Sequence, residues 1–131
     1  MLLKPSTYMN LSGKAVRYWL EQERIPIENL LVVVDDIALP FGTLRMRTKG
    51  SDGGHNGLKN INELLQTDAY SRIRFGIGGD FARGGQVDYV LGEWTAAERE
   101  ALPARLKVFA DAVLSFASIG AERTMNFFNK K

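Results

Sequence analysis

The sequence contains no cysteine, which excludes disulfide bonds and thiolate chemistry and fits a cytoplasmic location. It has no run approaching the about 20 consecutive apolar residues that a membrane helix needs. Its longest apolar stretch, Leu30 to Val34, has the length of a strand. The N-terminus shows no basic region followed by an apolar core, so no secretory signal is expected. The net charge of +2 tolerates a polyanionic partner without demanding one.

What the sequence does contain is an alternation of strand and helix patterns. Strands are expected where apolar residues form a short run or alternate with polar ones, over residues 30–34, 44–48, 73–77 and 87–91. Helices are expected over residues 11–23, after Gly57, and from the capping-box pattern that begins at Thr95. The alternation predicts one α/β domain over residues 1–131, with a mixed, mostly parallel twisted sheet and helices on both faces.

The last long helix carries an apolar stripe that is expected to face the core. Its members recur at helical spacing: Leu106, Phe109, Ala110, Val113, Leu114 and Ala117. The Phe127–Phe128 pair is expected in the core as well. Pro103 either starts a second helical segment or kinks the first, and Gly120 is suited to end the helix.

An aromatic residue, an amide and a hydroxyl cluster just before the first helix, within Lys4 to Gly13. Free backbone N–H groups at a helix N-terminus favour anions, and the side chain of Asn10 offers both a donor and an acceptor. Asn10 is therefore a candidate for orienting a carbonyl group or a water molecule. The alternative is that Asn10 or Ser12 only caps the helix.

Two adjacent acids, Asp35 and Asp36, end the apolar strand. In α/β sheets, the carboxyl ends of strands are where ligands usually bind. An aspartate there can orient a histidine as a triad carboxylate does, can hold a metal ion, or can simply face water. Because the chain has one histidine and no other ligand cluster, the case for a metal is weak, and no metal or cofactor is expected.

Residues 50–57 form a glycine-rich loop that opens a helix and contains the only histidine, His55. Glycine permits positive φ or close approach of the backbone. The spacing of a phosphate-binding P-loop is missing. His55 is either a general base or a residue that is hydrogen-bonded inside the loop and holds its shape.

Five cations lie on the polar sides of two short strands: Arg45, Arg47, Lys49, Arg72 and Arg74. If the strands are neighbours, these cations form a patch suited to a phosphate backbone. The alternative is a solvated sheet face that resists aggregation.

Several longer motifs follow one another in a fixed order along the chain. Residues 4–14 match the pattern P-x-x-[FY]-M-N-x-S-G, residues 33–42 match D-[DE]-x-x-L-P-x-G, and residues 53–59 read GGHNGLK. Residues 72–78 match R-x-[RK]-x-G-I-G, and residues 87–92 and 125–127 fit the same series. In order and spacing these stretches resemble the bacterial-type peptidyl-tRNA hydrolase family over nearly the whole chain.

The resemblance implies an enzyme that cleaves the ester between a peptide and the 3′ ribose of tRNA, and so recycles tRNA from stalled translation. It implies that Tyr8, Asn10 and Asn56 line the substrate site. It also implies that Asp35 orients the family's catalytic histidine. The stretch GGHNGLK at residues 53–59 matches the family's hallmark loop, to which His55 belongs without being that catalytic base. The tRNA contacts that it implies are Arg45, Arg47, Lys49 and Arg74. A monomer without a metal is implied as well.

The sequence departs from the family pattern at its front. The family begins with a strand, a G-L-G-N-P-G loop and a T-R-H-N-x-G segment whose histidine activates water, and these motifs do not occur here. We therefore expect a truncated start and an exposed sheet edge through which the chain can dimerise. Two alternatives stay open: a non-catalytic tRNA-binding module on the same scaffold, and a substitute catalytic pair of His55 with Asp35 or Asp36.

We expect the 131-residue chain alone to be inactive or very weak as a peptidyl-tRNA hydrolase, because general-base catalysis contributes roughly 10²–10⁴-fold. The measurement is peptide release from an N-blocked aminoacyl-tRNA, with a form extended upstream to the next in-frame start for comparison. Turnover by the 131-residue chain near that of a complete relative would contradict this expectation and would make His55 the first residue to mutate.

Overall fold

The computed structural model describes residues 1–78 and 94–129, which fall into two compact units. Unit 1 comprises Met1–Leu30 and Thr48–Ser71, and unit 2 comprises Leu31–Arg47 and Arg72–Lys131. The strand expected at residues 87–91 lies outside the described residues, and a single domain over residues 1–131 stays a prediction. No helix within the described ranges is long and apolar enough to cross a membrane.

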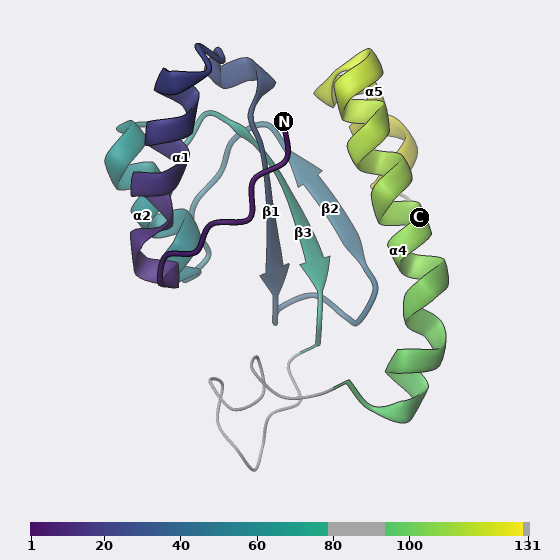
Figure 1. Cartoon of the computed structure of the whole chain (residues 1–131). Coiled ribbons are helices and arrows are strands. Elements are labelled where there is room, and N and C mark those ends of the chain that lie inside the picture. The colour runs from purple at the N-terminus through teal and green to yellow at the C-terminus, as the bar shows by residue number, and fades with distance from the viewer. Residues whose placement is uncertain (79–93, 130–131) are drawn as a thin grey trace. The chain divides into compact units, whose positions relative to one another are not determined.

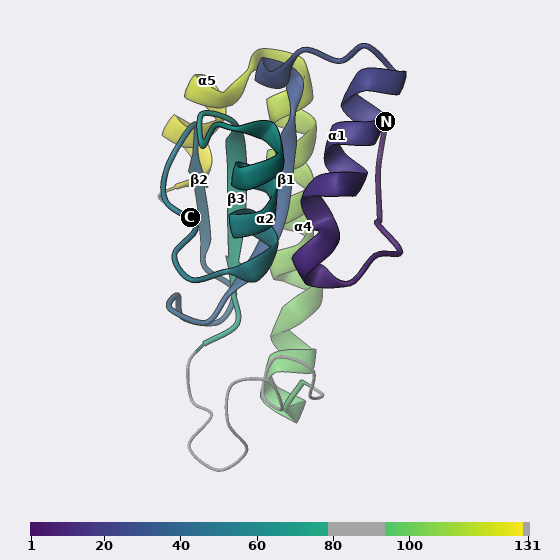
Figure 2. The same cartoon turned by 90° about the vertical axis from the view of Figure 1, so that its left-hand side faces the viewer.

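Unit 1 is built on two helices, α1 (Ser12–Gln22) and α2 (Asn56–Leu65). The two helices lie side by side, as Figure 2 shows. Short 3-10 turns stand on either side of α1, namely η1 (Met9–Leu11) and η2 (Ile27–Asn29). Both helices occur where hydrophobic periodicity predicts them.

The close packing of α1 on α2 depends on Gly13. Its backbone N–H donates to Asn60 Oδ1 at 2.7 Å. A Cβ atom on Gly13 would lie 2.5 Å from the carbonyl oxygen of Asn60, which is far inside van der Waals contact. Glycine at this position therefore lets the first turn of α1 approach α2.

Unit 2 contains a three-stranded sheet in the order β1–β3–β2, to which unit 1 contributes only Ser71. The strands are β1 (Leu31–Asp36), β2 (Leu44–Arg47) and β3 (Ser71–Gly76). Strands β2 and β3 are antiparallel, whereas the arrows of β1 and β3 point the same way in Figure 1. The sheet is mixed, and the predicted mixed α/β class is confirmed.

Helices α4 (Ala96–Ile119) and α5 (Ala121–Phe128) lie along one side of this sheet (Figure 1). The predicted capping box is confirmed at the start of α4. Thr95 Oγ1 accepts from the N–H of Glu98 at 3.1 Å, and Glu98 Oε1 accepts from the N–H of Thr95 at 2.9 Å. Pro103 lies inside α4, which continues through it to Ile119, and Gly120 follows with φ 88°.

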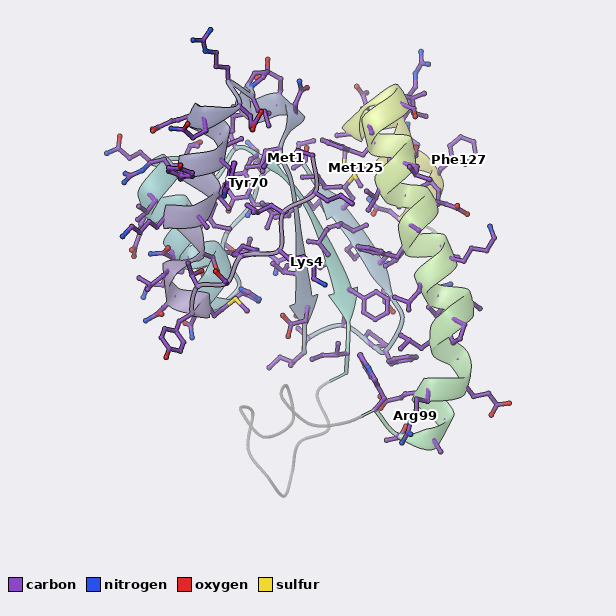
Figure 3. The ribbon with its side chains drawn as sticks, in the orientation of Figure 1. Met1, Lys4, Tyr70, Arg99, Met125 and Phe127 are labelled. Atoms are coloured by element: carbon purple, nitrogen blue, oxygen red, sulfur yellow. The ribbon has the colours of Figure 1, made fainter. Side chains whose placement is uncertain are left out.

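The core between this sheet and the helices is centred on Met46, Ile73 and Ala112. Partly buried apolar residues pack against these three: Leu31, Phe109, Phe116, Ala121, Met125 and Phe128. In Figure 3, Met125 points toward the sheet and Phe127 points away from it.

The predicted core stripe of α4 is largely wrong, because Leu106 is 47% exposed and Leu114 is 65% exposed. The helix is apolar on more than one side, and the side that meets the sheet is the one that carries Ala112. Leu114 lies two residues from Ala112 and therefore on the opposite side of the helix. Phe127, also expected in the core, is 65% exposed.

Two expectations about strand faces are also wrong. Val33 is 49% exposed, although a sheet with helices on both faces is expected to bury the apolar strand at residues 30–34. Helix α5 packs against β2, at the opposite edge of the described sheet from β1. Arg72 is 1% exposed, although it is expected on an accessible basic face, whether that face binds phosphate or only water; it lies on β3, the central strand of the described sheet.

The turn after β1 is joined to the end of β3 by a close backbone contact at Gly76. The N–H of Gly76 donates to the carbonyl of Thr43 at 2.8 Å, and its own carbonyl accepts from the N–H of Gly42 at 2.9 Å. A Cβ atom on Gly76 would lie 2.1 Å from the carbonyl oxygen of Pro40. The L-P-F-G and G-I-G stretches therefore need glycine at position 76 because they meet there.

We expect Gly76→Ala to lower the free energy of unfolding by about 3 kcal/mol, because the new methyl group would have to displace backbone. Gly54→Ala is the matched control. Gly54 has φ +83°, and a Cβ atom added there would meet nothing within 4 Å, so only backbone strain of about 1 kcal/mol is expected. Urea unfolding of both variants checks the order, and a loss at position 76 no larger than that at position 54 would contradict it.

Candidate functional site

The glycine-rich loop of unit 1 folds back on itself just before α2 begins. The N–H of His55 donates to the carbonyl of Asp52 at 2.9 Å, and Asp52 Oδ1 accepts from the N–H of Gly54 at 2.8 Å. The two residues inside this turn, Gly53 and Gly54, have φ values of 59° and 83°. Positive φ at consecutive positions explains the paired glycines.

His55 caps the N-terminus of α2. Its Nδ1 accepts from the N–H of Gly57 at 3.1 Å and from the N–H of Leu58 at 3.2 Å. A Cβ atom on Gly57 would lie 2.9 Å from His55 Cε1, so glycine at 57 leaves room for the imidazole ring. Two interpretations of His55 were open, a general base and a residue that holds the loop in shape. The structure favours the second, because the Nδ1 lone pair already accepts from these two N–H groups.

The first helix of unit 1 does not use the expected caps. Ser12 is the first residue of α1, and its hydroxyl donates backward to the carbonyl of Met9 at 2.7 Å. The N-cap position is Leu11, which makes no side-chain cap bond. The capping alternative for Asn10 or Ser12 is therefore wrong.

A contact between Met9 and Gly57 joins the first motif to the hallmark loop. A Cβ atom on Gly57 would lie 2.7 Å from Met9 Sδ, so the thioether rests directly on the first turn of α2. Asn10 and Asn56 are the sequence neighbours of these two residues, and both are exposed. The first family motif includes Met9 directly before Asn10, although no role for Met9 was predicted from it.

The amides of Asn10 and Asn56 are available to a ligand. Within residues 1–78 and 94–129, neither side chain makes a hydrogen bond. Tyr8 directly precedes η1 and is 82% exposed. Unit 1 thus presents a tyrosine hydroxyl and two amides, and each of these groups can both donate and accept hydrogen bonds.

In unit 2, the acids at the end of β1 have different surroundings. Asp36 Oδ1 accepts from the N–H of Ala38 at 2.8 Å, and Asp36 Oδ2 lies 3.4 Å from Arg74 Nη1. Asp36 therefore supports the turn and neutralises an arginine. Because successive side chains of a strand alternate, Asp35 leaves the opposite face of β1, where it is partly buried.

The register of β2 on β3 places four arginines on one face of the sheet. Arg45 lies opposite Arg74, and Arg47 lies opposite Arg72. Exposure differs strongly along this face: Arg72 is buried, the side chain of Arg74 is 18% exposed, and Arg47 is exposed. The cations that remain accessible therefore lie on β2.

The chain matches known proteins along its whole length. A family model described as Peptidyl-tRNA hydrolase matches residues 1–131. The peptidyl-tRNA hydrolase of Parabacteroides distasonis is 61% identical over 131 residues, which cover all of this chain and 70% of that protein. The chain belongs to the peptidyl-tRNA hydrolase family. The predicted family is confirmed.

Other members of the family match in sequence and in structure. The peptidyl-tRNA hydrolase of Cytophaga hutchinsonii is 59% identical over 131 residues, again covering all of this chain and 70% of that protein. The crystal structure of peptidyl-tRNA hydrolase from Acinetobacter baumannii superposes with a TM-score of 0.85 at 29% identity. It covers 95% of this chain, whereas this chain spans 63% of the Acinetobacter protein.

The residues predicted from the family motifs are divided between the two units. Unit 1 contains Tyr8, Asn10, His55 and Asn56, and it also carries the exposed Lys49. Unit 2 carries Asp35, Arg45, Arg47 and Arg74. The roles that the family resemblance implies for these residues stay predictions. Among the described residues, no group of three or more acidic or histidine side chains is arranged to hold a metal ion.

We expect His55→Ala to lower the free energy of unfolding by about 1 kcal/mol, because α2 loses the acceptor at its N-terminus. His55→Asn is the matched control, since asparagine is among the best N-cap residues and should retain most of that stability. Urea unfolding of both variants is the measurement. Equal losses in the two variants would contradict the capping role.

Proposed function

We propose that this chain belongs to an enzyme that hydrolyses the ester between a peptide and tRNA, and so recycles tRNA from stalled translation. The observation that carries the proposal is identity of 58–61% to peptidyl-tRNA hydrolases over the full 131 residues. The enzyme would act in the cytoplasm, where translation occurs, and as a monomer, with dimerisation through a sheet edge as the alternative.

In this proposal, unit 1 holds the end of the substrate where the ester lies. Tyr8, Asn10 and Asn56 line the site, and the two asparagine amides are its polar contacts. Met9 supports them by packing on Gly57. Asp35 in unit 2 orients the family's catalytic histidine and favours its active form, as the carboxylate of a catalytic triad does.

The proposed contacts to the tRNA backbone are Arg45, Arg47 and Lys49. Arg47 and Lys49 are exposed and Arg45 is half-buried, so all three have surface to offer to phosphates. Arg74 is a weaker candidate for direct contact, because it pairs with Asp36 and little of its side chain is exposed. Its positive charge still adds to the field on this face of the sheet.

We expect the double variant Arg45→Ala with Arg47→Ala to bind tRNA more weakly and with less dependence on salt. Each lost phosphate contact should lower the slope of log affinity against log salt by about 0.9, so the pair should lower it by about 2. Fluorescence titration with labelled tRNA at several salt concentrations measures both effects. Arg123→Ala, which removes an exposed arginine of α5, is the control. An unchanged slope in the double variant would count against this surface.

The second candidate function is a non-catalytic RNA-binding module, which the arginines of β2 also favour. Peptide release from N-blocked aminoacyl-tRNA separates the two functions when it is measured beside tRNA binding. Salt-sensitive binding without release, in the extended form as well as in this chain, would favour the module.

The substitute catalytic pair of His55 with Asp35 or Asp36 has less support, because His55 Nδ1 is engaged as the cap of α2.

A further inference from the structure

The residue that follows α5, Asn129, closes the outer edge of β2. Asn129 Oδ1 accepts from the N–H of Met46 at 2.7 Å, and Asn129 Nδ2 donates to the carbonyl of Met46 at 3.0 Å. An amide side chain carries a donor and an acceptor side by side, as a peptide group does. A single side chain therefore takes the place that a neighbouring strand would occupy beside Met46.

The same residue also holds Arg45. The main-chain carbonyl of Asn129 accepts from Arg45 Nη1 at 3.3 Å, and the carbonyl of Leu44 accepts from the same nitrogen at 2.9 Å. Within the described part of the chain, both bonds of this guanidinium fall on Nη1. The edge formed by Nε and Nη2 is left for a bidentate contact, which is the geometry in which arginine binds phosphate.

Arg47 shares an acceptor with Asn129. Its Nη1 donates to the carbonyl of Met46 at 2.8 Å, and that carbonyl is also the acceptor for Asn129 Nδ2. The side chain of Asn129 thus fixes the backbone group to which Arg47 is tied. Both accessible arginines of β2 are held by one network that Asn129 completes.

We propose that Asn129 is a positioning residue for tRNA binding, acting through Arg45 and Arg47. It fixes the edge of β2 and presents both guanidinium groups in a set orientation before tRNA arrives. Ordering long side chains on binding costs affinity, and ordering them in advance avoids part of that cost. The inference rests on the proposed function, since it needs the arginines of β2 to contact tRNA.

The test is a double-mutant cycle on the full chain. Asn129→Ala is measured once alone and once together with Arg45→Ala and Arg47→Ala, with tRNA affinity and its salt slope as readouts. Alone, it should weaken affinity by about two- to five-fold, the range of a single exposed charge contact. Together with the arginine changes, it should have no further effect. Asn126→Ala, an exposed asparagine of α5, is the control and should change neither readout.

The outcomes distinguish the inference from the proposed function. If Asn129→Ala weakens binding equally with and without the two arginines, its role is only structural and the inference is overturned. The inference is also overturned if the arginine changes weaken binding but Asn129→Ala alone does not. If the arginine changes have no effect, the proposed tRNA surface itself fails, and the inference fails with it.

A second variant, Asn129→Ser, has a hydroxyl that can keep one bond to Met46. It is measured in the same cycle, and circular dichroism checks that each variant is folded. It decides the question should the alanine variant unfold.

Discussion

Gly76 and the carbonyl of Pro40 approach each other so closely that no side chain fits between them, and the layout of unit 2 depends on that contact. The contact lets the chain leave β1, turn, and pair with β3. The N–H of Gly76 donates to the carbonyl of Thr43, and the carbonyl of Gly76 accepts from the N–H of Gly42. The register of β2 on β3 begins at this point. Because side chains alternate along a strand, a shift by one residue would exchange the two faces of β2. The contact therefore helps to determine which side meets α4 and α5.

Once the register is set, the electrostatics of the sheet follow. Arginines directly opposite each other on neighbouring strands repel, so each such pair needs compensation. Asp36 provides it for Arg74, and Arg72 is buried with an interaction partner of its own. The inner part of the arginine face is thus occupied by internal interactions. Arg45 and Arg47, on the edge strand β2 of the described sheet, donate to backbone carbonyls. Neutral carbonyls do not cancel a positive charge, so both charges remain available to a partner.

Much of this arrangement is local and was predictable from the sequence. The capping box at Thr95, the helix after Gly57 and the alternation in β2 each involve residues only a few positions apart. The side of α4 that meets the sheet was not predictable, because the helix is apolar on several sides and periodicity alone does not choose between them. The burial of Arg72 could not be predicted from the sequence for a related reason. Alternation shows which side chains share a face of a strand, but it does not show how deeply each side chain is buried.

The candidate site could likewise be predicted only in part from the sequence. The family motifs give Asn10 and Asn56, and the structure adds that Met9 links their neighbourhoods by resting on Gly57. His55 has a pattern that suits either a base or a structural residue, and only the bonds to Gly57 and Leu58 favour one of them. Asn129 could not be found from the sequence, since its partner Met46 is 83 residues away.

In the described sheet, the amide of Asn129 also closes the outer edge of β2. A strand added to an edge would present a new edge in turn, and that is how sheets grow from one molecule to the next. A side chain fills the hydrogen-bonding positions of Met46 without offering such a template. Another chain could pair with β2 at Met46 only after the C-terminal end of α5 had been pulled away. Asn129 therefore blocks the addition of a strand beside Met46.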